Sequence, residues 1–434
     1  MALRHLRPGA RTARFRSPVP LPPRSEGVTP WTPSASSARS VEYYEDQGHR
    51  RITGSTLLPE PGDPVLFTSA GMHPLTPYLE GRPHPLGRRL VNVQRCLRTT
   101  DLDEVGDSTH LTVFEMLGTW SLGDYEGSRS LDWAHRLLTE GLGVDPGLLH
   151  ATVYGGGEQV GPDTESLRLW QERGVPVERT VDDNWWSNGP VGPCGPDSEI
   201  FLWSGDTPPR STPTGDDRWV EVWNHVMMRH RRLDDGRLVP LPQRNVDTGL
   251  GLERLAMLLQ GKSSVFECDV FEPWRRLLPV LWPLDEPSFR VVCDHLRSAV
   301  VVVGDGVRPS NTGRGYVLRR LVRRLLTVLW RDDPSRGLGD LPDELITHTL
   351  DHFRQDGDPG LPGLVRRLLV EEERRFRRLL DRGRNVLARP RFRGPLGEED
   401  FHYLHDTHGL PRELVTSLRE GEYPETEGVG AVRS

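Results

Sequence analysis

Residues 245–254 constrain the fold more than any other stretch of the chain, and they read NVDTGLGLER. A strand-like entry meets a turn with two glycines, and a helical pattern of leucines begins at Leu252. Glycines let a strand and a helix pack closely and let a ligand approach the backbone. Arg254 can reach a phosphate or a base face, and Asp247 places a carboxylate nearby. The pattern predicts a site for a substrate with phosphate and ammonium groups, although a simple packing turn looks the same.

Length, charge and cysteine use narrow the class of protein. The 434 residues suffice for two or three domains. With a net charge of −7, nucleic-acid binding would rest on local basic patches. Lys262 is the only lysine among 55 basic residues, which a GC-rich genome explains without selection for RNA binding. Four cysteines without paired metal spacing favour a reduced, cytoplasmic protein, and no apolar run approaches the ~20 residues of a membrane span.

Composition divides the chain into three parts. Residues 1–40 are rich in Arg, Pro and Ser, with Glu26 as their only acid, and they predict a disordered extension. A transit peptide has a similar composition, but the many prolines argue against its amphipathic helix, so a loose tail or a mis-set start codon is favoured. Residues 41–275 alternate short β-rich runs with glycine turns, and residues 276–434 have helical periodicity. The predicted fold class is α+β, with an antiparallel sheet flanked by helices and followed by an all-helical region.

Several elements can be predicted individually. Strands are expected at residues 64–68, 111–114, 199–203 and 219–224. Helices are expected at 131–142 and, with apolar residues at amphipathic spacing, at 364–388. The apolar run 299–303 is typical of a buried strand or helix segment.

Taken together with other segments, residues 245–254 resemble the third signature motif of class II aminoacyl-tRNA synthetases. The sequence VDTGLGLER is similar to the form of this motif in the alanyl branch of the family. Further segments follow in the family's order. The first motif is matched by DPVLFTSAGMH (63–73), and the two halves of the second are matched by QRCLR (94–98) and THLTVFEMLG (109–118). The alanine-pocket segments of the family are similar to DNWW (183–186), GPCGP (192–196) and VWNHV (222–226). The acceptor-stem-binding segments are similar to PSNTGRGYVLRR (309–320) and DTHGLP (406–411). The resemblance covers residues 41–420. It implies a class II aminoacylation catalytic domain over 41–275 and a helical acceptor-stem recognition domain over 276–434.

The resemblance implies that ATP activates alanine to alanyl-adenylate, which then charges the 3′ end of the tRNA for alanine. ATP with Mg²⁺ would be the cofactor; alanine and the tRNA acceptor stem would be the partners; no membrane is expected to take part. The transition state is highly anionic, so fixed positive charge matters more than a general base. Arg98 is the implied catalytic residue, because a guanidinium can fork to the carboxylate and the α-phosphate. In isolation, Arg98 would be read as a surface arginine.

The implied ligand contacts come from the second and third motifs and from the pocket segments. The ATP-binding residues are Arg98, His110, Phe114, Gly251 and Arg254, and the amino-acid-binding residues are Trp186, Asn224, Val226, Asp247 and Gly249. Phe114 and Arg254 would stack on the two faces of adenine. His110 would contact a phosphate or cap a turn.

In the amino-acid pocket, Asp247 would pair with the ammonium, helped by the Val226 carbonyl, and Asn224 would hold the carboxylate. Trp186 and Gly249 would wall the side-chain space and leave little room beyond a methyl. Two adjacent tryptophans on a strand cannot both point inward, so one of residues 185 and 186 needs a role outside the core.

The implied tRNA-binding residues are Asn311, Arg314, Arg319, Arg320, Arg323, Arg324 and Asp406. The last four arginines recur on one face of a presumed helix, which suits phosphate contacts, although a solvated helix face has the same pattern. Asn311 and Asp406 match positions that read a G·U pair in the shallow groove of A-form RNA.

The chain departs from the family in two places. Only two residues separate Arg98 from Asp101, where many bacterial relatives have a longer insert. The sequence also stops at Ser434, before the family's editing domain, with its zinc-binding His/Cys set, and its oligomerising tail. We therefore expect no zinc, no proofreading and a monomer. His348 and His352 have the i, i+4 spacing of metal ligands but are interpreted as helix-surface histidines, and no metal ligand is assigned.

Two other functions remain open beside tRNA charging. The chain could be a specialised paralogue that passes the activated amino acid to a carrier protein or a biosynthetic pathway, or that serves in drug resistance. It could also be an inactive RNA-binding or regulatory protein. The intact activation residues argue against the inactive protein, and Asn311 and Asp406 favour tRNA charging over a carrier-protein ligase.

Overall fold

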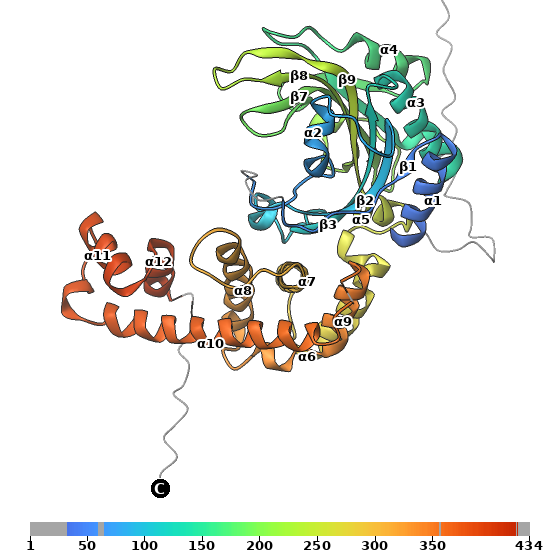
Figure 1. Cartoon of the computed structure of the whole chain (residues 1–434). Coiled ribbons are helices and arrows are strands. Elements are labelled where there is room, and N and C mark those ends of the chain that lie inside the picture. Colours follow the sequence, from blue (N-terminus) through green and yellow to red (C-terminus); the bar gives the residue numbers. More distant parts are fainter. Residues whose placement is uncertain (1–32, 60–64, 356, 422, 424–434) are drawn as a thin grey trace, which may run out of the picture.

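The computed structural model describes residues 33–59, 65–355, 357–421 and 423. A twisted sheet with flanking helices forms one part, and helices from α6 onward form a second part below it (Figure 1). Residues 1–32 of the expected disordered extension lie outside the described residues. The expectation was wrong for residues 33–40, because helix α1, Pro33–Asp46, begins there. Ser36, Ser40 and Tyr44 are buried, so this helix has a packed face that its polar composition conceals.

Within the described residues, nine strands form one sheet in the order β1-β2-β3-β9-β8-β7-β4-β5, with β6 paired to β7. Their bounds are Arg50–Arg51, Arg89–Leu97, Val113–Leu122, Leu149–Tyr154, Val177–Thr180, Trp185–Ser187, Gly192–Trp203, Trp219–Arg232 and Leu238–Gly251 for β1 to β9. Most neighbours are antiparallel, but β1 with β2 and β4 with β5 run parallel. The predicted α+β class is confirmed, and the sheet, which was expected to be antiparallel, is mixed because two of its strand pairs run parallel. A parallel pair needs a crossover, and helix α4, Thr164–Glu172, lies between β4 and β5 in the chain.

Three of the four predicted strands overlap β3, β7 and β8. The fourth prediction was wrong, because the described residues 65–68 form no strand. The backbone of Thr68 bonds once to Leu57 and once to Leu97, at 2.9 Å each, so this segment makes isolated contacts and no ladder.

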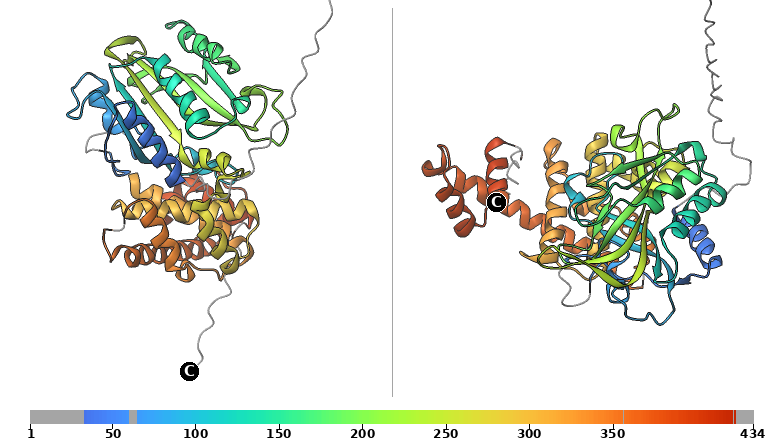
Figure 2. Two further views of the ribbon diagram at one scale, coloured as in Figure 1. Left: turned by 90° about the vertical axis from the view of Figure 1, so that its right-hand side faces the viewer. Right: turned by 90° about the horizontal axis from the view of Figure 1, so that it is seen from above.

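Helices cover one face of the sheet (Figure 2). These are α1, α3 (Gly127–Arg136), α4 and α5 (Leu252–Leu259), and their apolar side chains share a core with the sheet. A π-helical turn, Leu137–Gly141, extends α3 over most of the predicted helix 131–142. The opposite face carries the short helix α2, Thr76–Leu79, and a small cluster around Trp120. The rest of that face is left open for a site.

The second part consists of helices α6 to α12. Their bounds are Glu272–Leu281, Glu286–Gly304, Gly313–Asp332, Asp343–His352, Leu361–Leu387, Glu398–His408 and Arg412–Glu420. Helix α10 matches the predicted helix 364–388 and runs beneath α7 and α8 towards α11 and α12 (Figure 1). Short 3-10 turns lie at His73–Leu75, Asp101–Asp103, Pro146–Leu148, Pro213–Gly215, Val265–Glu267, Asp269–Phe271, Leu338–Asp340 and Pro390–Phe392. No helix in the described part of the chain is long and apolar enough to cross a membrane.

The two parts share one hydrophobic core. Leu97 and Val113 at the sheet end belong to the same buried cluster as Leu296 and Val300 of α7. All residues from 291 to 303 are buried, so α7 is covered on every side. The apolar run 299–303 is thus a buried helix segment. The predicted boundary near residue 275 marks a change of secondary structure within a continuous core.

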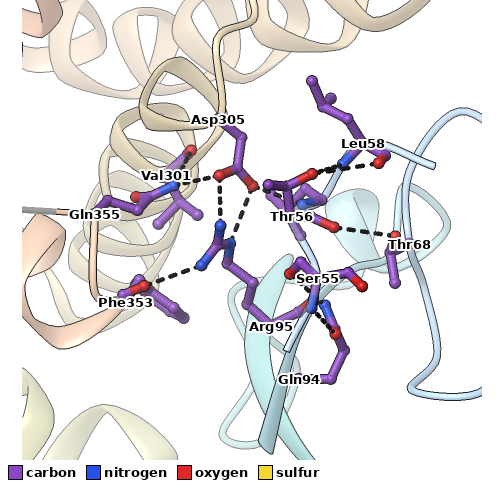
Figure 3. A network of polar contacts seen from close by, with 11 residues as sticks. Ser55, Thr56, Leu58, Thr68, Gln94, Arg95, Val301, Asp305, Phe353 and Gln355 are labelled. Atoms are coloured by element: carbon purple, nitrogen blue, oxygen red, sulfur yellow. Dashed lines mark hydrogen bonds and ion pairs between the residues drawn. The ribbon is translucent and has the colours of Figure 1, made fainter. Parts of the chain in front are cut away.

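A polar network ties the sheet to the helices at the edge of this core (Figure 3). Asp305, just after α7, accepts hydrogen bonds from Nε and Nη2 of Arg95 on β2, at 3.0 and 2.6 Å. It also accepts from the backbone N–H of Leu57, at 2.6 Å, and from Gln355, at 2.8 Å. Arg95 donates in turn to the Phe353 carbonyl, at 3.0 Å. Asp305 is 3% exposed and Arg95 is 16% exposed, so the ion pair is largely removed from water.

A second buried link lies deeper. Arg297 of α7 donates to Glu253 of α5 at 3.0 Å, and each side chain is 2% exposed. Close by, Nε2 of His352 lies 3.2 Å from the Glu115 carboxylate, and Nε2 of His348 lies 2.9 Å from the Val270 carbonyl. The interpretation of the two histidines as helix-surface residues was therefore wrong, because His352 contacts Glu115 of β3 with only 11% of its side chain exposed, and His348 contacts the 3-10 turn Asp269–Phe271.

Candidate active site

A cavity of about 710 Å³ opens on the sheet face that the helices leave free. Most residues singled out in the sequence line it together: Arg98, Phe114, Trp186, Asn224, Val226, Asp247, Gly249, Gly251 and Arg254. They come from β3, β6, β8, β9, the start of α5 and the loop after β2. Among the described residues, His110 is not one of those that line the cavity.

The register of the central strands sets the amino-acid end of the cavity. Asp197, Val226 and Asp247 lie side by side across β7, β8 and β9. The next row on the same face places Glu199, Asn224 and Gly249 side by side. A Cβ on Gly249 would lie 2.7 Å from the sulfur of Met116, so a larger residue here would require the flexible Met116 side chain to shift.

Arg98 lines the cavity from the position directly after β2. Its Nε donates to the Ser69 carbonyl at 3.3 Å, and its guanidinium carbon lies 5.1 Å from the centre of the Phe114 ring. The backbone N–H of Arg98 donates to Thr112 at 3.0 Å, which extends the pairing of β2 with β3 by one residue. The cation and the aromatic ring are therefore adjacent before any ligand binds.

Arg254 is oriented by an acid that the sequence did not single out. Its Nη1 donates to the side chain of Glu221 at 3.2 Å and to the Glu221 carbonyl at 3.1 Å. His110 is paired within its own turn, with Nδ1 2.5 Å from Asp107 and its backbone N–H donating to Asp107 at 2.8 Å. The Asp107 hydrogen bond raises the pKa of His110.

The two tryptophans of β6 point to opposite sides. Trp185 packs against Tyr154 and His230, with ring centres 5.3 and 6.1 Å apart. Trp186 lines the cavity. The sequence argument that one of them serves something other than the core is consistent with this placement.

Three further acids belong to the site. Glu199 and Glu221 line the cavity, and Asp197 lies behind it. Burial raises the pKa of Asp197 to about 7; burial, then the charges of Glu221 and Asp197, raise the pKa of Glu199 to about 9. A cation would relieve this repulsion, and carboxylate oxygens suit Mg²⁺. Asp197 and Glu199 lie on β7 and Glu221 lies on β8, and none of them stands out in the sequence as a site residue.

The arginines of α8 are engaged in ion pairs. Arg319 and Arg323 contact the fully buried Glu372 of α10, at 3.2 and 2.9 Å. Arg320 and Arg324 contact Asp103, which follows the second-motif loop. The first pair thus joins α8 to α10, and the more exposed second pair joins α8 to the 3-10 turn Asp101–Asp103 beside the cavity.

The remaining RNA-binding candidates surround the start of α8 and the end of α11. Arg314 donates to the Leu66 carbonyl at 2.5 Å, and Leu66 lines the cavity mouth. Asn311 accepts a hydrogen bond from Arg319. Asp406 is exposed on α11, where its carboxylate lies 2.8 Å from Nδ1 of His405.

This fold and this set of motif residues define a class of enzymes. A sequence model of the class II (A) tRNA synthetases matches residues 38–425, and the chain belongs to that family. The resemblance read from the motifs is thereby confirmed.

The relatives point to one branch of the family. The alanine–tRNA ligase of Treponema pallidum is 40% identical over 415 residues, which cover 88% of this chain and 67% of the relative. That of Treponema denticola is 42% identical over 306 residues, covering 66% and 51%, and that of Borreliella afzelii is 36% identical over 403 residues, covering 87% and 67%. The chain thus spans about half to two thirds of these curated relatives.

Proposed function

We propose that the chain activates alanine with ATP and transfers the alanyl group to the tRNA for alanine. The observation that carries this proposal is the shared cavity, in which Arg98, Asp247 and Trp186 meet Arg254. A phosphate-binding cation, an ammonium-binding acid, a wall against long side chains and an adenine-stacking cation serve one substrate set together. The names of the relatives support alanine as the amino acid.

In the proposed reaction, a carboxylate oxygen of alanine attacks the α-phosphorus of ATP while the bond to pyrophosphate breaks. Arg98 binds both oxyanions and holds them together. Phe114 and Arg254 position the adenine between them. Mg²⁺, when bound with ATP, neutralises phosphate charge, and Glu199 and Glu221 are the residues that would hold it. A ribose hydroxyl at the tRNA 3′ end then attacks the alanyl carbonyl, and AMP leaves.

Amino-acid-dependent exchange of pyrophosphate into ATP tests the first step. We expect exchange with alanine and weaker exchange with glycine and serine, because discriminating such small differences in one pocket is hard. A larger amino acid as the best substrate would contradict the pocket assignment.

Alanine affinity is expected to rise with pH through about 7. Burial raises the pKa of Asp247 to about 7, so the side chain is neutral below that pH and charged above it. Only the charged form attracts the ammonium, so affinity is lost as pH falls. Asp247→Asn should weaken alanine binding about 10- to 100-fold and leave ATP binding intact. It should also remove the part of the pH dependence of alanine affinity between pH 6 and 8 that comes from the titration of Asp247. Calorimetry with alanine and with ATP measures both; a collapse of ATP binding alone would contradict this role.

The RNA step has its own prediction. Asn311→Ala and Asp406→Ala are expected to impair charging of the tRNA for alanine and to leave pyrophosphate exchange near wild type, because exchange uses no RNA. With G·C in place of G·U in the acceptor stem, wild type should fall towards the level of the variants. Charging assays with both tRNAs measure this. Robust exchange without charging of any tRNA would instead favour a carrier-protein or biosynthetic role.

A further inference from the structure

A buried carboxylate lies directly behind the amino-acid end of the cavity. Asp197 is 1% exposed and, among the described residues, is not one of those that line the cavity. Its Oδ2 lies 3.4 Å from Nδ2 of Asn224, which does line it. The sequence analysis gave Asp197 no role.

Asp197 is held firmly from the other side. Its Oδ1 accepts from Nδ2 of Asn184 at 2.9 Å, and its backbone N–H donates to the Asn184 carbonyl at 3.0 Å. The Asn184 amide is fixed in turn, since it accepts from Thr180 at 2.6 Å and donates to Thr152 at 2.9 Å. The carboxylate therefore cannot turn away from Asn224 without breaking a buried network.

This arrangement decides which end of the Asn224 amide faces Asp197. The Asn224 atom next to Oδ2 of Asp197 is Nδ2, the donor end of the amide, and a carboxylate oxygen is an acceptor. The other end, Oδ1, is buried and has no hydrogen-bond partner among the residues that the structure describes. A buried carbonyl oxygen without a partner is uncommon, and a ligand with an N–H group would satisfy it.

We propose that Asp197 is a positioning residue that fixes the Asn224 amide so that its Oδ1 accepts a hydrogen bond from the substrate ammonium. This inference rests on the proposed function and changes the role of Asn224 from carboxylate to ammonium recognition. With the Asp247 carboxylate and the Val226 carbonyl, Asn224 completes three acceptors for the three N–H groups of a primary ammonium. The site then selects primary amines, because an N-methyl group would leave one acceptor unpaired.

Alaninol, which has the ammonium and methyl of alanine but no carboxylate, is the probe that separates the two roles. We expect Asp197→Asn to weaken binding of alanine and alaninol alike, about 10- to 100-fold, since a neutral amide no longer dictates the orientation of Asn224. The KM for alanine should rise more than kcat falls, and ATP affinity should be retained.

The reciprocal variant Asp197→Asn/Asn224→Asp is the sharper test. It again presents an acceptor to the ammonium, with an amide donor behind it, so alaninol affinity should recover relative to Asp197→Asn alone. Ser198→Ala is the matched control on the same strand. Ser198 bonds Trp170 and the Thr152 carbonyl, at 2.8 Å each, so its loss perturbs β7 but not the ammonium.

Asn224→Ala gives an independent measurement if Asp197→Asn does not fold. Equal losses of alanine and alaninol affinity support the ammonium role, whereas a loss for alanine alone shows that a second N–H of Nδ2 serves the carboxylate and overturns it. An absence of alanine-dependent exchange in wild type would contradict the proposed function itself. Alanine-dependent exchange in wild type, together with unchanged alaninol affinity in Asp197→Asn, would overturn the positioning role of Asp197 and leave the proposed function standing.

Discussion

Arg98→Ala is expected to slow alanine-dependent pyrophosphate exchange roughly 10²- to 10³-fold, equivalent to about 3–4 kcal/mol of transition-state stabilisation. The guanidinium lies 5.1 Å from Phe114 and at the cavity mouth, where no general base is needed but two oxyanions must approach each other. Its loss leaves their repulsion without a fixed counter-charge. Steady-state exchange at saturating ATP and alanine measures the effect.

Arg98→Lys is the informative companion to that variant. It keeps the positive charge but loses the planar fork that binds two groups at once, so exchange should fall between wild type and Arg98→Ala. Arg237→Ala, in the exposed turn between β8 and β9, controls for the removal of an arginine as such. Exchange at the wild-type rate in Arg98→Ala would remove this residue from the site.

Asp305→Ala is expected to lower the free energy of unfolding by about 3–5 kcal/mol. The variant leaves Arg95 charged and largely buried, and it deprives the Leu57 N–H of its acceptor and Gln355 of one of its two acceptors. Breaking one side of a buried ion pair costs more than the pair contributes, because the remaining charge is no longer compensated. Urea denaturation followed by tryptophan fluorescence measures the loss.

The double variant Arg95→Met/Asp305→Leu distinguishes this cause from a general loss of packing. With both charges removed, we expect it to be more stable than Asp305→Ala alone. The single variants Arg95→Met and Asp305→Leu complete the comparison. If the loss of unfolding free energy in the double variant equals the sum of the losses in these two single variants, an uncompensated charge is not the source of the effect.

The convergence of the proposed activation residues on one cavity could be predicted because each of them stands within a short contiguous motif. Arg98, Phe114, Asp247 and Arg254 all reach the same cavity, as the ordered motifs implied. Asp197, Glu199 and Glu221 could not be found in this way. They enter the site through the register of β7, β8 and β9, and a pairing between distant strands leaves no local pattern in the sequence.

Some features of the fold depend on tertiary contacts that sequence periodicity and composition do not reveal. Arginines on one face of α8 predicted a free basic surface, yet their partners Glu372 and Asp103 are 49 or more residues away in the chain. Helix α1 begins within a stretch whose composition indicated disorder, because the core behind it accepts small polar residues. The parallel pairing of β4 with β5 likewise depends on where a crossover helix docks.

The burial of helix α7 limits how the chain can be divided into separately folded fragments. A fragment cut near residue 275 would keep the buried run 291–303 but lose Leu97 and Val113, which cover part of it. An apolar helix that loses one packing partner exposes a continuous hydrophobic surface, which favours association with other copies of the fragment. The complementary fragment would expose the matching end of the sheet. Neither half is thus expected to fold well alone, and an isolated helical fragment made by cutting there would tend to aggregate.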